Sequence, residues 1–380
     1  MRTVSFLTLV LLTILPAFAQ FEAKMIDFNN KLEINLAKES LPNSLGDKIR
    51  SVNVIDARDD SGAVGYYYIK RSEAFKHGIK PGEAGKKGYD SWSKIYYCSP
   101  TLKDGFAEWI SAYLQCRKND SVKNNLLIVV KKLWLSPEAD KTGFDDDKTT
   151  PLTNEWDAGV LCKLEFYLER DSIFYPLYRI DSIFTYKDRL NDYEGLRFVD
   201  NAGSFITSTL KKSLVKLADI NPGEIIAKRR KLSFNEIYRE YSKKTEVPIL
   251  KSVVLNKGVY KDFEEFKANS PSIREYELRE SKMGDILYVK DGNSEYPSRT
   301  VWGFCDGTDI FINSGDKYSK LVRRENTFYF FGIKGLTRKS KHVFLKSSAL
   351  NYAANTGEKK SVYKMELKYY QVDMETGEAY

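Results

Sequence analysis

The residue types that most often carry enzyme chemistry are scarce in this chain of 380 residues. It contains two histidines, His77 and His342. His77 lies in a charged, glycine-rich segment and His342 in a basic one, so we expect both to be solvated side chains rather than catalysts. The chain has no nucleophile elbow, zinc-binding histidine pair, phosphate-binding loop or dinucleotide fingerprint. We therefore assign no catalytic, cofactor-binding or metal-binding residue and expect no cofactor.

The four cysteines match no metal-binding spacing, because no two of them form a C-x-x-C pair. Cys98 and Cys116 are the least distant pair in the sequence, and an oxidising compartment would allow them to form a disulfide. The sequence leaves open whether they do. Cys162 falls on the apolar face of a predicted strand, so we expect it to be a buried free thiol. The fourth is Cys305.

Carboxylates are the remaining candidates for catalysis, since two of them are enough to hydrolyse a glycan. The chain has 52 acidic residues, so the sequence singles out no pair. Asp145, Asp146 and Asp147 are consecutive and lack the alternating ligand positions of a calcium-binding loop. We expect an ordinary loop at these three residues.

The first nineteen residues have the pattern of a signal peptide. Arg2 supplies a positive charge, residues 4–15 are largely apolar, and Ala17-Phe18-Ala19 gives a small-x-small cleavage pattern before Gln20. The alternatives are a membrane anchor and a buried helix, but the apolar run is short for a bilayer span. We expect an exported mature chain without a transmembrane span, located in the periplasm, at the outer membrane or outside the cell.

The charge balance is mildly basic, with 60 Lys and Arg against 52 Asp and Glu. Export argues against nucleic acid as a partner. The positive charge is compatible with an anionic glycan or lipid surface as a partner, and general solubility explains the charge equally well. The densest basic run is Lys228-Arg229-Arg230-Lys231. It is either a contact for an anionic lipid or glycan, or simply a solvated helix start.

The elements before residue 220 predict an α+β domain over residues 20–220. Ser99 and Pro100 suggest a capped helix start, and Asp200 could cap a second helix. Both helices are expected to cover one face of a mostly antiparallel sheet. Residues 76–94 read as a long loop. Strands are expected at 49–57, 64–70, 126–135, 159–170 and 174–186, with a turn at Asp171-Ser172.

Residues 221–250 read as a helical linker and 251–380 as a β-rich domain that a short helix opens. Ile249–Leu255 is expected to be a strand. Gly258 permits an unusual backbone turn, and Asp262 can cap the short helix. Phe263 and Phe266 are predicted to lie on one side of that helix and to pack onto the β-domain core near Trp302.

The segment from Trp302 to Asn313 predicts a β-hairpin with a two-residue turn at Asp306-Gly307. Pairing outward from Cys305 and Thr308 places Trp302 opposite Phe311. Such aromatic pairs fix strand register. Packing is therefore the expected role of Trp302, with sugar stacking as the alternative.

Two family resemblances follow from these residues. The segment Val54-Ile55-Asp56-Ala57-Arg58, then Gly62 and Val64-Gly65, a helix, a strand pair and a second helix, resembles the auxiliary lipoprotein-like domains of ABC transport systems. That resemblance implies an envelope domain that binds partners and is not a catalyst. The chain lacks the lipidation cysteine of those proteins, so membrane anchoring does not carry over.

The second domain has its own resemblance. The segments GVYKDFEEFKANSPS, WGFCDGTDIFIN and NTFYFFG resemble uncharacterised exported two-domain proteins of the Bacteroidetes type. This implies compartment and fold kinship and transfers no catalytic residue. Proteins of this type are O-glycosylated at Asp-Ser-aliphatic sites, and Ser121, Ser172 and Ser182 fit that pattern; the sequence does not decide whether they are modified.

These observations favour a non-catalytic binding or assembly module of the bacterial cell envelope over an enzyme. Its expected partner is an envelope protein or an anionic glycan or lipid surface. One alternative is a secreted hydrolase that acts on glycan or peptide through carboxylates. The other is a structural surface protein.

Overall fold

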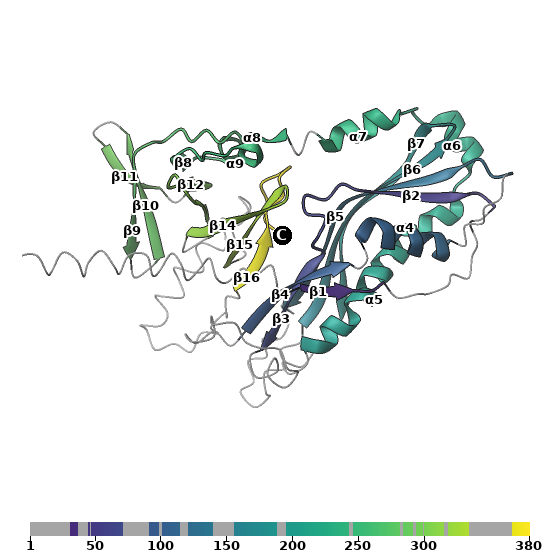
Figure 1. Cartoon of the computed structure of the whole chain (residues 1–380), viewed down its shortest axis with the longest axis horizontal. Coiled ribbons are helices and arrows are strands. Elements are labelled where there is room, and N and C mark those ends of the chain that lie inside the picture. The colour runs from purple at the N-terminus through teal and green to yellow at the C-terminus, as the bar shows by residue number, and fades with distance from the viewer. Residues whose placement is uncertain are drawn as a thin grey trace, which may run out of the picture. The chain divides into compact units, whose positions relative to one another are not determined.

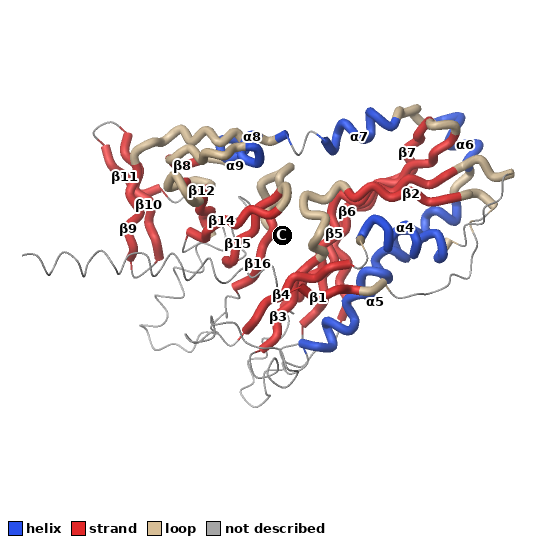
Figure 2. The backbone as a smooth tube through the Cα atoms, viewed as in Figure 1, coloured by secondary structure: helices blue, strands red, loops and turns tan. Residues whose placement is uncertain are grey.

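The computed structural model shows a mixed α and β protein in which strands predominate (Figures 1 and 2). It divides into two compact units, one formed by Phe28–Ser242 and one that contains Lys243–Tyr380, and each is described by itself. The structure describes residues 31–36, 45, 47–70, 91–98, 101–114, 121–139, 156–187, 195–242, 246–281, 284–291, 294–298, 300–314, 318–333 and 367–380. Outside these residues lie the predicted signal peptide (1–19), His77, His342, Cys116 and Asp145–Asp147.

A seven-stranded sheet forms the centre of the first unit. Its strands run in the order β1-β4-β3-β5-β6-β7, and β2 pairs with β5 off this path. The described elements are β1 (Lys31–Ile34), β2 (Ser51–Asp56), β3 (Gly65–Lys70), β4 (Ser91–Cys98), α4 (Leu102–Tyr113), β5 (Asn125–Ala139), β6 (Trp156–Arg170), β7 (Ile173–Lys187), α5 (Gly195–Leu214), the 3-10 helix η2 (Val215–Asp219), α6 (Pro222–Lys228) and α7 (Phe234–Ser242).

Three long antiparallel strands, β5, β6 and β7, dominate this sheet. Asp171 and Ser172 connect β6 to β7 with φ of 53° and 62°, the geometry of a type I′ turn, so the predicted turn is confirmed. The parallel pairs β1–β4 and β2–β5 were not predicted. The chain between β2 and β5 includes α4, and a crossover of this kind returns a strand parallel to the first.

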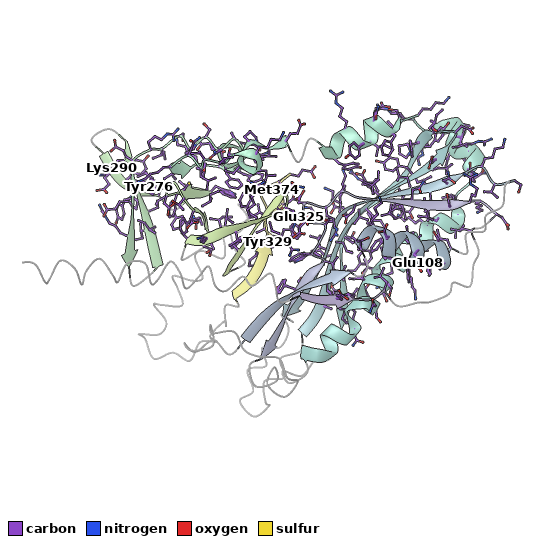
Figure 3. The ribbon with its side chains drawn as sticks, in the orientation of Figure 1. Glu108, Tyr276, Lys290, Glu325, Tyr329 and Met374 are labelled. Atoms are coloured by element: carbon purple, nitrogen blue, oxygen red, sulfur yellow. The ribbon has the colours of Figure 1, made fainter. Side chains whose placement is uncertain are left out.

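Helices α4 and α5 cover the same face of the sheet, as predicted (Figure 1). Phe106 and Ile110 from α4 and Ile206 and Leu210 from α5 enter one core with the inward residues of β2, β5 and β6. Glu108, labelled in Figure 3, is on the exposed side of α4.

Three local predictions for this unit are wrong. Helix α4 is capped by Thr101, whose hydroxyl accepts from the Asp104 amide at 3.2 Å, and not by Ser99. Helix α5 begins at Gly195, so Asp200 lies inside it and is not its cap. The end of the predicted loop 76–94 is strand: β4 begins at Ser91, because its aromatic-rich sequence pairs with both β1 and β3.

The second unit contains two antiparallel sheets. A six-stranded sheet has the order β16-β15-β14-β13-β12-β8, and a three-stranded sheet the order β11-β10-β9. Tyr276 and Lys290, labelled in Figure 3, belong to the smaller sheet. The elements are α8 (Pro248–Lys251), β8 (Gly258–Tyr260), α9 (Phe263–Lys267), β9 (Tyr276–Ser281), β10 (Gly284–Asp291), β11 (Ser294–Ser298), β12 (Gly303–Cys305), β13 (Ile310–Asn313), β14 (Tyr318–Arg324), β15 (Thr327–Ile333) and β16 (Leu367–Gln371).

The entrance helix α9 is built as predicted. The Asp262 side chain accepts from the Glu265 amide at 3.0 Å and caps the helix. Phe266 is fully buried and stacks on Trp302 with ring centroids 4.1 Å apart, and Phe263 lies 5.7 Å from the same ring. Gly258 has φ of 148°, but it lies in a strand rather than a turn.

Two predictions for this unit are wrong. The expected strand Ile249–Leu255 begins as the short helix α8, because Pro248 occupies a first-turn position that needs no amide donor. The hairpin turn contains four residues, so Cys305 pairs with Ile310 and Phe304, not Trp302, lies opposite Phe311. The Asp306 carboxylate accepts from the amides of Thr308 and Asp309 at 2.8 and 2.7 Å and so stabilises the wider loop.

Candidate binding surface on helix α7

Helix α7 lies within the segment predicted as a linker, residues 221–250, and it packs on the sheet face opposite α4 and α5. Its inward residues Ile237 and Tyr241 join a separate apolar cluster with Leu127, Val129 and Phe174. Ile237 and Tyr241 are four residues apart, so they lie on the same face of the helix. The cluster holds α7 against the strands.

The start of α7 is fixed by a reciprocal cap. The Ser233 hydroxyl accepts from the Glu236 amide at 3.2 Å, and the Glu236 carboxylate accepts from the Ser233 amide at 2.7 Å. Two of the amides that a helix start leaves without intrahelical partners are satisfied in this way. The backbone pair between Phe174 and Leu232, with two N–O distances of 2.9 Å, ties the preceding residue to β7.

A buried polar cluster lies beneath the C-terminal end of α7. Lys131 is 6% exposed, and its Nζ lies 2.8 Å from Glu165 Oε1. The hydroxyls of Tyr167 and Tyr241 both donate to Glu165 Oε2 at 2.7 Å. The Lys131 ammonium also lies 5.1 Å from the centre of the Tyr241 ring. We call Lys131, Glu165, Tyr167 and Tyr241 the Lys131 cluster.

The geometry of β5 explains why a lysine occurs in this position. Val130 pairs with Leu164 and Lys132 with Lys163, so Lys131 is the extra residue of a β-bulge. A bulge redirects the side chain of the inserted residue. Sequence reasoning missed the whole cluster; the available signal was the charged pair Lys131-Lys132 interrupting an otherwise apolar strand.

Two effects of the environment of Glu165 act on its pKa in opposite directions. Burial alone would raise the pKa of this carboxyl, but hydrogen bonds from Lys131, Tyr241 and Tyr167 outweigh it and hold the pKa below its ordinary value. The same arrangement raises the pKa of Tyr241, through burial first and then through its bond to the Glu165 carboxylate. At neutral pH Glu165 is therefore a carboxylate and Tyr241 a neutral phenol.

Acid is expected to destabilise the first unit through Glu165. A carboxylate with a lowered folded-state pKa contributes stability above its unfolded pKa, about 4.3, and loses it as pH falls through the folded value. The free energy of unfolding of the wild type should therefore fall more steeply between pH 6 and pH 3 than that of Glu165→Gln. Urea unfolding at pH 6, 4 and 3 measures this. Parallel pH profiles for the two proteins would refute the role given to Glu165.

The outer side of α7 carries two exposed aromatic rings. Phe234 is 46% exposed and Tyr238 is 51% exposed, and their rings stack at 5.8 Å with 14° between their planes. Phe234 also lies 6.0 Å from the buried ring of Phe174, which anchors the pair to β7. The rings thus form a small apolar surface on a helix that is otherwise polar outward.

The predicted basic run precedes these rings and divides into two kinds of residue. Lys228 forms an ion pair with Glu224 at 2.6 Å, and Arg230 with Glu236 at 3.1 Å. Arg229 and Lys231 are exposed and have no ion pair among the described residues. We call Arg229, Lys231, Phe234 and Tyr238 the α7 surface; two cations and two stacked rings lie within ten residues of the chain.

The other candidate residues lie elsewhere. Cys162 and Cys305 are buried free thiols, which confirms the expectation for Cys162, and burial raises the pKa of Cys162 to about 12. Cys98 lies in β4, and its disulfide state stays a prediction because Cys116 is outside the described residues. Trp302 is partly buried and packs against the core of the second unit, so packing is its role, as expected. Ser121, Ser172 and Ser182, the predicted glycosylation sites, are all exposed.

The fold class that these elements define is α+β. Helix α7 and the Lys131 cluster lie on the face of the mixed sheet opposite α4 and α5. Across the described ranges, no three His, Cys, Asp or Glu side chains gather as metal ligands. Among the same residues, no helix is long and apolar enough to cross a bilayer. Comparison with known protein families, with functionally described proteins and with solved structures found no match.

Proposed function

We propose that the chain is a non-catalytic binding module of the bacterial cell envelope whose α7 surface contacts an anionic glycan or lipid surface. The observation that carries this proposal is the exposed, stacked pair Phe234 and Tyr238, which follows the exposed cations Arg229 and Lys231 within ten residues of the chain. The predicted signal peptide supports export of the chain to a compartment where such surfaces occur.

The chemistry of the α7 surface suits an anionic partner with apolar parts. Arg229 and Lys231 can pair with phosphate or carboxylate groups. Phe234 and Tyr238 can insert among acyl chains at a headgroup boundary or stack on the apolar face of a sugar ring. Both partners share one requirement, a negative group adjacent to an apolar surface.

The contacts that hold α7 in place favour recognition by a surface that is already formed before binding. The reciprocal cap, the apolar cluster and the Lys131 cluster fix the helix at its start, middle and end. A surface that is already ordered loses little conformational freedom when it binds. The two rings are therefore presented in one arrangement, without a folding step.

The Lys131 cluster gives no support to the alternative of a carboxylate-dependent hydrolase. A general acid needs a raised pKa and a proton to give, and the pKa of Glu165 is lowered. Both oxygens of Glu165 already accept from Lys131 or from tyrosine hydroxyls. The cluster is better suited to positioning α7 than to acid–base catalysis.

Neutralising the two cations should weaken binding to anionic surfaces. Each basic residue near such a surface contributes about 1 kcal/mol, so Arg229→Gln with Lys231→Gln should lower affinity about thirtyfold. The measurement is binding of residues 20–380 to phosphatidylglycerol-containing vesicles and to alginate, an acidic polysaccharide. Whichever of the two probes binds identifies whether the anionic groups belong to a lipid or to a glycan.

Two further variants complete this test. Phe234→Ala with Tyr238→Ala should weaken binding while leaving the charge unchanged. Lys103→Gln, which removes one exposed cation from α4, should bind as the wild type does. If neither probe binds, or if the α7 variants bind like the wild type, the proposal fails.

A further inference from the structure

Strand β7 forms one edge of the seven-stranded sheet, and most of its outer side has no strand partner among the described residues. It pairs with β6 on its inner side over almost its whole length. On its outer side the described residues supply a single bridge, between Phe174 and Leu232. A strand edge of this kind exposes backbone amides and carbonyls that can pair with another chain.

The exposed side chains along this edge are complementary in charge. Arg179 and Asp181 are two residues apart, so they lie on the same face of β7, and both are exposed. Lys163 approaches Asp181 only to 3.7 Å, and the Asp181 side chain remains 58% exposed. Ile183 follows on the same face and is 65% exposed, which is unusual for so large an apolar side chain in a strand.

We propose that β7 pairs with β7 of a second copy of this chain, antiparallel and with Ile180 opposite Ile180. A two-fold axis through an antiparallel pair makes the interface self-complementary. In this register Arg179 of each copy lies opposite Asp181 of the other, so the symmetry forms two cross-strand ion pairs from one motif.

The charges of Arg179 and Asp181 favour this register over the two neighbouring registers. Moving the axis by one residue in either direction places Asp181 opposite Asp181 or Arg179 opposite Arg179, and like charges directly opposite are destabilising. The stretch that pairs runs from Leu177 to Ile183. Pro176, which has no amide to donate, and the bridge at Phe174 stop the pairing at one end.

The competing explanation is that Arg179 and Asp181 prevent edge-to-edge association, as charges on edge strands often do. The two explanations differ in what charge reversal does. A protective charge has no specific partner, so exchanging the two charges would leave the chain monomeric. A paired charge depends on its partner, so the exchange should restore what each single reversal destroys.

Sedimentation velocity over a concentration series of residues 20–380 tests the proposal. The wild type should show a reversible dimer. Arg179→Asp and Asp181→Arg should each raise the dimer dissociation constant by about tenfold or more, because each places like charges opposite each other. The double exchange should return it to within about threefold of the wild type, and Lys103→Glu should leave it unchanged.

Hydrogen exchange provides a readout that needs no variant. Amides in residues 177–183 should become more protected as the protein concentration rises, and those of the buried strand β5 should not change. A chain that stays monomeric at all concentrations overturns the proposal. So does a dimer whose dissociation constant is insensitive to both single reversals.

Discussion

Replacing Lys131 with methionine is expected to lower the free energy of unfolding by about 3 kcal/mol, because it leaves the Glu165 carboxylate without its cation. Both side chains are largely removed from water, with exposed fractions of 6% and 16%. The two tyrosine hydroxyls still donate to Glu165, but they carry no charge. Urea denaturation at pH 7 measures the change.

The matched control for this prediction lies on the neighbouring strand. Lys163 lies 3.7 Å from Asp181, whose side chain is 58% exposed, so Lys163→Met should cost less than about 1 kcal/mol. The double variant Lys131→Met with Glu165→Gln should recover most of the loss, because it removes both charges and keeps an acceptor for the two tyrosine hydroxyls. Equal effects of Lys131→Met and Lys163→Met would contradict a buried, paired Lys131.

Replacing Phe266 with alanine is expected to destabilise the second unit by about 4 kcal/mol, through lost burial and the cavity it leaves. The side chain is fully buried, stacks on Trp302 at 4.1 Å and meets Phe328 edge-on at 5.2 Å. The Tyr260 ring approaches it at 5.7 Å. No small rearrangement of these three neighbouring rings fills such a space, so the loss of stability should lie at the upper end of the range for Phe→Ala.

Thermal unfolding followed by near-ultraviolet circular dichroism measures this effect through the Trp302 environment. Tyr296→Ala is the control, because that ring is 44% exposed on β11 and its loss should change stability by less than about 0.5 kcal/mol. A Phe266→Ala variant that unfolds at the wild-type temperature would show that α9 does not anchor this core.

The long strands and the entrance helix could be predicted because their evidence is local. Alternation from Val160 to Leu168 gives β6 its two faces without reference to any other strand. Asp262 and Phe266 likewise lie within one turn of each other, so cap and buried face both follow from spacing. Strand β4 was missed because pairing with β1 and β3 stabilises it, and because a glycine-rich sequence precedes it.

The hairpin register and the Lys131 cluster required distances that a sequence does not contain. An Asp-Gly pair fits a two-residue turn, but the Asp306 carboxylate binds two loop amides and selects a longer one. The Lys131 cluster joins residues from β5, β6 and α7 and depends on a one-residue bulge. For the α7 surface, the sequence located the basic run but not the exposed rings of Phe234 and Tyr238.

Site-specific photo-cross-linking from α7 tests most directly whether the α7 surface binds an envelope partner. Benzoylphenylalanine at position 238 would be compared with the same group at position 103, on the exposed side of α4, in the cells that make the protein. The proposal predicts an adduct with an anionic glycan or lipid from position 238 and none from position 103. No adduct from position 238, or equal adducts from both, would contradict the proposal.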